Sequence, residues 1–123
     1  MATVLMKEDK KGFRVFATAR NAESISDLHE RGIETLSLEV HKPDSIRNVK
    51  AQLDQLTGGR LDFLVNNAGR NYTVPALDVD FDEVQQTFEV NVFAIMRICQ
   101  EFAPLLIRSK GTIVQIGSIA GVM

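Results

Sequence analysis

The sequence predicts an α/β fold in which helices cover a doubly wound parallel β-sheet. Short, mostly apolar segments alternate along the chain with longer amphipathic ones, which is typical of parallel strands joined by helices. Several of the short segments are almost continuously apolar, which indicates strands that are buried on both faces. Glycines and polar loops separate the segments, as turns require.

Size and charge indicate a single domain and argue against a nucleic-acid-binding or membrane-spanning protein. The chain has 123 residues, of which 45% are hydrophobic and 24% charged, as in one soluble globular domain. Its 14 basic and 16 acidic side chains leave a net charge of −2, which argues against nucleic acid as a partner. No apolar stretch approaches the roughly 20 residues of a membrane-spanning helix, so no transmembrane segment is expected. A single cysteine, Cys99, predicts a reducing compartment and a cytoplasmic location.

The first half of the chain contains two predicted strands and a helix between them. Residues 13–17 are short and mostly apolar, which favours a buried strand. Residues 22–31 place two apolar side chains among charged ones and are followed by Gly32. This pattern is typical of a surface helix with a glycine at its C-terminus. Residues 33–40 alternate apolar and polar side chains, as a half-buried strand does.

The second half repeats this order of elements. A helix is expected from Pro43, because proline is tolerated in a first helical turn. Its apolar side chains recur three and four residues apart, at Ile46, Val49, Leu53 and Leu56. Residues 61–65 form a third predicted strand, residues 80–107 a long helix and residues 112–116 a last strand.

The N-terminal residues do not fit a wholly parallel sheet. Residues 2–6 have the composition of a strand, but residues 7–12 alone separate them from the strand at 13–17. A parallel crossover needs a dozen or more residues. Either the N-terminus lies elsewhere, or it forms an antiparallel or frayed edge.

Polar side chains follow three of the predicted strands, where open parallel sheets bind ligands. Thr18 and Arg20 follow the first, Asn-Asn-Ala-Gly at 66–69 the third, and Ser118 the last. The Arg20 guanidinium can hold a phosphate through a fork of hydrogen bonds, or it is only a solvated charge. The two asparagines let the backbone approach a flat ligand, or they form a turn. Ser118 is a hydrogen-bond donor to a substrate or a loop hydroxyl.

Four motifs include these clusters. They are FATAR at residues 16–20, LVNNAG at 64–69, EVNVF at 89–93 and GTIVQIGSIAGV at 111–122. Together they resemble the short-chain dehydrogenase/reductase family, and NNAG between a strand and a loop is a specific signal. The resemblance begins at about Gly12 and continues to the last residue. It implies a single partial NAD(P)-binding domain over residues 1–123, with a Rossmann-type fold that is incomplete at both ends.

The resemblance also implies a site for NADP or NADPH. Arg20, with Thr18 nearby, would hold the 2′-phosphate of the cofactor. Glu39 stands where the family usually has an aspartate that touches the adenine. The residues that would line the adenosine ribose and steady the central sheet are Asn66, Asn67, Ala68 and Gly69.

Two further residues would act in catalysis by the same resemblance. Ser118 matches the serine that donates a hydrogen bond to the substrate carbonyl oxygen. Asn91 matches the helix asparagine that anchors a water molecule in the proton relay. The resemblance implies no metal ion.

Two parts of the family pattern are missing from these 123 residues. The glycine-rich turn T-G-x-x-x-G-x-G, which cradles the pyrophosphate, has no counterpart. The Tyr-x-x-x-Lys pair, which supplies and tunes the proton, has none either. Tyr72, the single tyrosine, has no lysine four residues on and is not a substitute. We expect His29 and His41 to be structural or solvent-facing.

Two functions remain open. One is an NADP-dependent oxidoreductase that moves a hydride between nicotinamide and a ketone or secondary alcohol, with activity impaired in this shortened chain. NNAGRNYTVPALD is most similar to fungal reductases of acyl-dihydroxyacetone phosphate and related steroid or lipid ketones. The other is a non-catalytic truncated product, a pseudoenzyme or a partner subunit. A flavodoxin-like or receiver-type module is less supported, because no acidic pocket or flavin loop is found. In the family, helices equivalent to residues 80–107 often form oligomer contacts, which implies a homo-oligomer.

Overall fold

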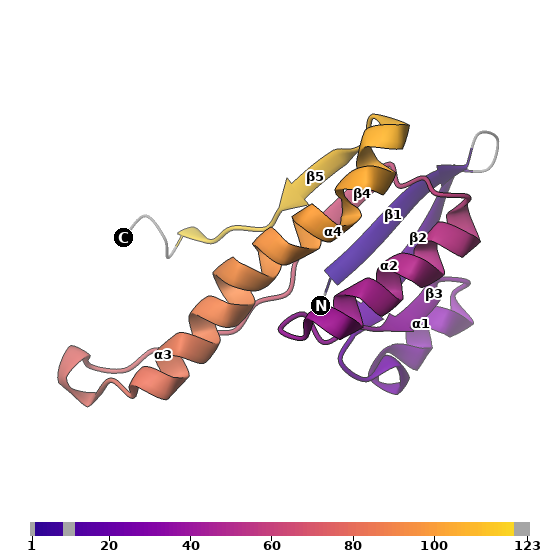
Figure 1. Ribbon diagram of the computed structural model, residues 1–123. Coiled ribbons are helices and arrows are strands. Elements are labelled where there is room, and N and C mark those ends of the chain that lie inside the picture. The colour runs from indigo at the N-terminus through magenta and orange to yellow at the C-terminus, as the bar shows by residue number, and fades with distance from the viewer. Residues whose placement is uncertain (1, 9–11, 120–123) are drawn as a thin grey trace.

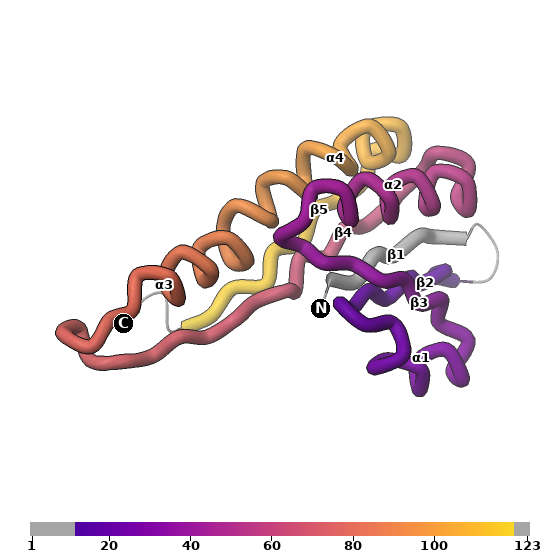
Figure 2. Tube along the Cα trace, turned by 60° about the horizontal axis from the view of Figure 1, so that its bottom comes forward, coloured from indigo at the N-terminus to yellow at the C-terminus, as the bar shows by residue number. Residues whose placement is uncertain are grey.

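The chain forms one β-sheet with helices on both of its sides (Figures 1 and 2). The computed structural model describes residues 2–8 and 12–119. The strands are β1 (Ala2–Glu8), β2 (Gly12–Ala19), β3 (Glu34–Ser37), β4 (Phe63–Asn66) and β5 (Thr112–Gln115). They lie in the order β3-β2-β1-β4-β5. The predicted α/β fold is confirmed.

Helical segments follow β2, β3 and β4, as predicted. They are η1 (Ala22–Ile25), α1 (Ser26–Glu30), α2 (Pro43–Thr57), η2 (Ala76–Asp78), α3 (Phe81–Phe88), η3 (Glu89–Phe93) and α4 (Ala94–Ser109). η1 and η2 are 3-10 turns, whereas η3 is a π-helical turn that joins α3 and α4 into one long helix. Figure 2 shows α2 and α4 on one side of the strands and α1 on the other.

The sheet is parallel except at β1. β2 pairs with β3, and β4 with β5, in the parallel sense, whereas β1 is antiparallel to both β2 and β4. Only residues 9–11 separate β1 from β2, and this link is too short for a parallel crossover. The antiparallel arrangement allowed by the spacing is confirmed. β1 nevertheless lies at the centre of the sheet rather than at an edge, so it has a hydrogen-bonded strand on each side.

The strand directions place the carboxyl ends of four strands at one edge of the sheet. β2, β3, β4 and β5 run in the same direction, so their carboxyl ends meet at a single edge. β1 runs the opposite way and places Ala2 beside Thr18 at that edge. Its carboxyl end, Glu8, pairs with Gly12 at the far edge. The carboxyl end of β1 therefore lies away from the carboxyl ends of the other strands.

The hydrophobic core lies mainly between the sheet and the pair α2 and α4. On α2, Ile46, Val49 and Leu53 are buried as the helical spacing predicts, whereas Leu56 is 41% exposed. The core residues are Phe16, Leu38, Val40, Ile46, Val49, Leu53, Leu61, Leu64, Ala94, Ile98, Phe102, Leu105 and Leu106. Burial of these side chains attaches both helices to the sheet and so supports its carboxyl edge.

Local capping signals set the helix boundaries. Pro43 occupies the first turn of α2, and Gly58 ends this helix with a left-handed φ of 64°, which glycine adopts without strain. Asp80 precedes α3, and its carboxylate accepts hydrogen bonds from the backbone N–H groups of Asp82 and Glu83. The loop after β4 is therefore joined to α3 at a defined residue.

The long helix Phe81–Ser109 has the length and apolar composition of a membrane span. It is the one such helix in the described ranges 2–8 and 12–119. The same composition occurs in core helices of soluble proteins, and Ile98, Phe102 and Leu105 of this helix are buried against the rest of the chain. The buried residues of this helix all lie in α4, whereas α3 and η3 contribute none to the core.

Replacement of Gly111 by alanine should destabilise the fold. A Cβ atom at this position would lie 2.9 Å from the backbone carbonyl oxygen of Asp62 and closer still to that of Leu61. Because backbone must move to make room, we expect Gly111→Ala to lower the free energy of unfolding by about 1–3 kcal/mol in urea denaturation. Gly117→Ala is the matched control, since no atom lies within 4 Å of its added Cβ. Equal stability of the two variants would contradict this packing.

Candidate functional site

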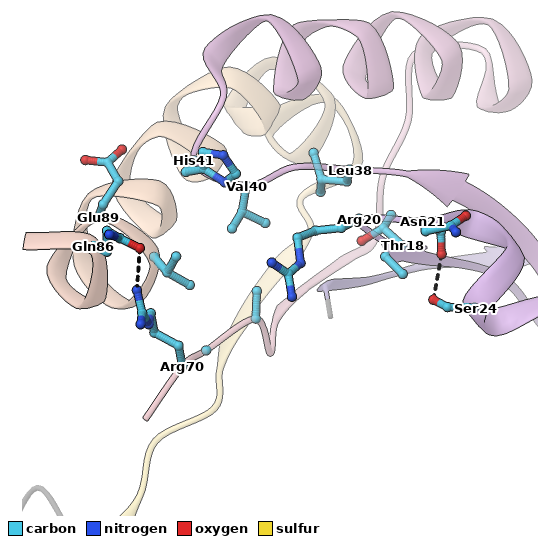
Figure 3. Close-up of a pocket in the computed structure, with 14 residues that line it drawn as sticks. Thr18, Arg20, Asn21, Ser24, Leu38, Val40, His41, Arg70, Gln86 and Glu89 are labelled. Atoms are coloured by element: carbon cyan, nitrogen blue, oxygen red, sulfur yellow. Dashed lines mark hydrogen bonds between the residues drawn. The ribbon is translucent and has the colours of Figure 1, made fainter. Parts of the chain in front are cut away.

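The carboxyl ends of β2, β3 and β4 surround a cavity of about 1000 Å³, with α3 and η3 forming another wall (Figure 3). The residues that line it are Thr18, Ala19, Arg20, Asn21, Ser24, Leu38, Val40, His41, Ala68, Gly69, Arg70, Gln86, Glu89 and Val90. Ligands bind at this edge in open α/β sheets. The structure therefore brings Thr18 and Arg20, after β2, together with Ala68 and Gly69, after β4.

Arg20 extends its guanidinium group into this cavity (Figure 3). Its backbone carbonyl accepts a hydrogen bond of 3.0 Å from Ser37 Oγ, which ties the end of β2 to the end of β3. Within residues 12–119, its guanidinium group makes neither a hydrogen bond nor an ion pair. An uncommitted guanidinium in a concave site is suited to bind an anion, because its planar donors match phosphate and carboxylate oxygens.

Glu39 lies beside the cavity but is not one of its lining residues. Its carboxylate is ion-paired with Lys42 at 2.8 Å, and its backbone N–H donates to Ser45 Oγ at 3.0 Å. The hydrogen bond from Lys42 holds the pKa of Glu39 below its ordinary value; partial desolvation opposes this, and the charges of Lys42, His41 and Arg20 reinforce it. The contact of Glu39 with an adenine stays a prediction.

The two asparagines after β4 differ in their surroundings. Asn66 is buried, and its amide donates a hydrogen bond to Cys99 Sγ on α4 at 3.5 Å. This bond connects the central sheet to the long helix. Its Oδ1 atom has no hydrogen-bond partner among the described residues. Asn67 is exposed, and neither asparagine lines the cavity.

Asn91 lies in the π-helical turn η3 and holds the loop that follows β4. Its Oδ1 accepts a hydrogen bond from the Arg70 backbone N–H, and its Nδ2 donates to the Arg70 carbonyl, both at 2.9 Å. The Arg70 side chain donates to Gln86 Oε1 at 2.9 Å and is ion-paired with Glu83 on α3. π-Helical turns are often found at functional sites. Here the turn presents the amide that fixes the cavity floor at Gly69 and Arg70.

The predicted hydrogen-bond donor Ser118 is exposed beyond the end of β5 and does not line the cavity. Tyr72, the single tyrosine, accepts a hydrogen bond from the Asp80 backbone N–H at 2.9 Å. Its hydroxyl therefore supports the start of α3 rather than the cavity. The structure thus gathers Thr18, Arg20, Ala68 and Gly69 around one cavity, whereas Ser118 lies outside its lining.

His41 and Arg70 are among the lining residues that the sequence does not single out as site residues. His41 is expected to be structural or solvent-facing, and in the structure it is half-buried in the cavity wall. The available signal was its position directly after the buried Val40, at the end of a predicted strand. Arg70 directly follows the NNAG motif, and no local pattern indicated that its side chain would reach Gln86 and Glu83.

Comparison with known proteins agrees with this geometry. The short chain dehydrogenase family model matches residues 1–123. A short-chain dehydrogenase of Talaromyces islandicus is 45% identical over 114 residues, which cover 92% of this chain and 40% of the relative. The NADPH-dependent 1-acyldihydroxyacetone phosphate reductase of Schizosaccharomyces pombe is 40% identical over 114 residues, which cover 93% of this chain and 38% of the relative.

Solved structures show the same fold. A short-chain dehydrogenase from Streptomyces avermitilis superposes with a TM-score of 0.80 and 32% identity, over 88% of this chain and 41% of that protein. The NADPH-bound carbonyl reductase from chicken fatty liver superposes with a TM-score of 0.79 and 28% identity, over 86% of this chain and 48% of that protein. The chain spans less than half the length of each of these four proteins. With the family model matched throughout and its fold shared, the chain belongs to the short chain dehydrogenase family of oxidoreductases.

Proposed function

We propose that the chain carries the adenosine end of an NADP site in an oxidoreductase that moves a hydride between nicotinamide and a ketone or secondary alcohol. The observation that carries this proposal is the uncommitted Arg20 guanidinium in the cavity at the carboxyl edge. An arginine after the second strand suits a 2′-phosphate, and no acidic side chain lines the cavity from β2 to favour a free 2′-hydroxyl. The names of the fission yeast reductase and the chicken carbonyl reductase support NADPH as the cofactor.

The cavity fits one end of this cofactor better than the other. Thr18 and Arg20 would hold the phosphorylated ribose, and Ala68 and Gly69 would lie against the adenosine. The sequence contains no glycine-rich T-G-x-x-x-G-x-G turn, and the end of β1 lies at the opposite edge of the sheet. The described residues therefore supply the adenosine end without the usual cradle for the pyrophosphate.

The reaction would also draw on two residues outside the cavity lining, Ser118 and Asn91. The bound nicotinamide supplies the hydride chemistry. Ser118 would donate a hydrogen bond to the substrate carbonyl oxygen, and Asn91 would serve the proton relay while its amide holds Arg70. The Tyr-x-x-x-Lys pair that completes proton transfer in the family is not among these 123 residues. We therefore expect these residues alone to have impaired turnover.

For the substrate, we propose a ketone or secondary alcohol of lipid, steroid or secondary-metabolite type. The printed name of the fission yeast relative, an acyldihydroxyacetone phosphate reductase, supports this class. We place the protein in the cytoplasm, in keeping with its single cysteine.

A non-catalytic role as a partner subunit is the second candidate. It is favoured by an exposed apolar row on the long helix, formed by Phe88, Val92 and Met96, whose side chains are 52%, 40% and 57% exposed. Their four-residue spacing places them on one face of the helix. A second copy of this chain is the proposed occupant of that face.

Replacement of Arg20 by alanine should remove discrimination between ribose phosphates. We expect the variant to bind adenosine 2′,5′-bisphosphate about tenfold or more weakly, with little change for adenosine 5′-monophosphate, because a charge-assisted hydrogen bond is lost. NMR titration of both nucleotides measures the two dissociation constants. Arg60→Ala is the control, since Arg60 is exposed and outside the cavity. An equal loss for both nucleotides would count against a 2′-phosphate site.

The full cofactor should bind little better than its adenosine end. We expect NADPH and adenosine 2′,5′-bisphosphate to have dissociation constants within about threefold of each other, because the hydrogen bonds of a pyrophosphate cradle are missing. Competition titration with the unmodified chain tests this expectation. NADPH affinity about a hundredfold higher would show that other residues hold the pyrophosphate.

The exposed row on the long helix should drive self-association. We expect the unmodified chain to form dimers or larger species in light scattering, because the apolar row is left in water. Met96→Lys places a charge in the row and should shift the population toward the monomer. Gln55→Lys adds the same charge at an exposed position on α2 and is the control. A monomeric unmodified chain would refute the second candidate.

A further inference from the structure

His41 shares the cavity with Arg20 although it lies in the turn after β3, whereas Arg20 follows β2. It directly follows the buried Val40, after β3, and its imidazole forms part of the wall in Figure 3. The side chain is half-buried. Within residues 12–119, the imidazole has no hydrogen bond or ion pair. It is therefore available to a ligand, as Arg20 is.

The carboxylates around the cavity are already engaged. Glu39 is ion-paired with Lys42, directly after His41 in the chain. On the helical wall, Glu89 is ion-paired with Arg97, and Glu83 is ion-paired with Arg70 at the cavity floor.

Because these acids are paired, the basic side chains that form no ion pair determine the electrostatic potential of the cavity. Each of these acids forms its ion pair with another base, so within residues 12–119 Arg20 and His41 are the basic groups of the wall that form no direct ion pair. Both also lie close enough to Glu39 to lower the pKa of its carboxyl group. Two basic groups without a direct ion pair, beside an acid already paired with Lys42, create a local field that attracts an anion.

We propose that His41 is a second phosphate-recognising side chain of this cavity, and that it makes binding of a 2′-phosphorylated adenosine depend on pH. The proposal rests on the nucleotide site proposed above and extends it to a residue in the turn after β3. A protonated imidazole can donate a hydrogen bond to a phosphate oxygen and add a positive charge opposite it. The neutral form lacks that charge, so the contribution of His41 should fall as the pH rises.

The phosphate has its own titration, and this sets the design of the test. A phosphate monoester gains its second negative charge near pH 6, which strengthens binding as the pH rises and opposes the effect of histidine. The measured quantity is therefore the ratio of dissociation constants between His41→Gln and the unmodified chain at each pH. Titration of the free nucleotide is the same in both measurements and cancels in the ratio.

The test is NMR titration with adenosine 2′,5′-bisphosphate at about pH 6 and about pH 8, where histidine changes its charge. We expect His41→Gln to bind about threefold more weakly at the lower pH, as for a partly exposed charge pair, and equally at the higher pH. His41→Lys, which keeps a positive charge, should bind more tightly than the unmodified chain at the higher pH. Adenosine 5′-monophosphate, which lacks the 2′-phosphate, should show neither effect.

His29→Gln is the matched control, because His29 is the second of two histidines and is exposed on α1, outside the cavity. It should leave both dissociation constants unchanged. A His41→Gln ratio that is the same at both pH values, with Arg20→Ala still weakening the bisphosphate, would overturn the role of His41 and leave the nucleotide site standing. No binding of adenosine 2′,5′-bisphosphate at either pH would overturn the nucleotide site, and the role of His41 with it.

Discussion

The common direction of β2, β3, β4 and β5 is the constraint on which the rest of the structure depends. The parallel pairs β2–β3 and β4–β5 are each connected through helical segments, because a parallel connection must return the chain to the starting edge of the sheet. The carboxyl ends of these strands therefore meet at one edge. Residues as distant in sequence as Thr18, His41 and Gly69 line the same cavity for this reason.

The central strand departs from that direction, and the departure has a chemical consequence. β1 supplies hydrogen bonds to β2 and β4, so the middle of the sheet is closed as it would be by a parallel strand. Its reversed direction, however, takes its carboxyl end to the far edge of the sheet. A phosphate cradle depends on a turn after the first strand that opens onto a helix N-terminus. The central strand position can therefore complete the backbone pairing of the sheet without placing a turn at the carboxyl edge.

Two sets of polar contacts define the chemistry of the cavity. Asn91 uses its whole side-chain amide on the backbone of Arg70, so the π-helical turn fixes the position of the cavity floor. The ion pairs of Glu39, Glu83 and Glu89 balance the acids around the cavity. The proposed anion site is compatible with a net charge of −2, because the local pairing of charges matters more than their total.

The sequence by itself determined the α/β class, because strand–helix alternation and the spacing of Ile46, Val49 and Leu53 are local patterns. It also identified the family and placed Arg20 after a strand. Only the tertiary structure decided that β1 lies antiparallel at the centre of the sheet and that His41 belongs to the same cavity as Arg20. Strand order and cavity walls arise from pairing between distant segments, and local side-chain patterns do not specify which distant segments meet.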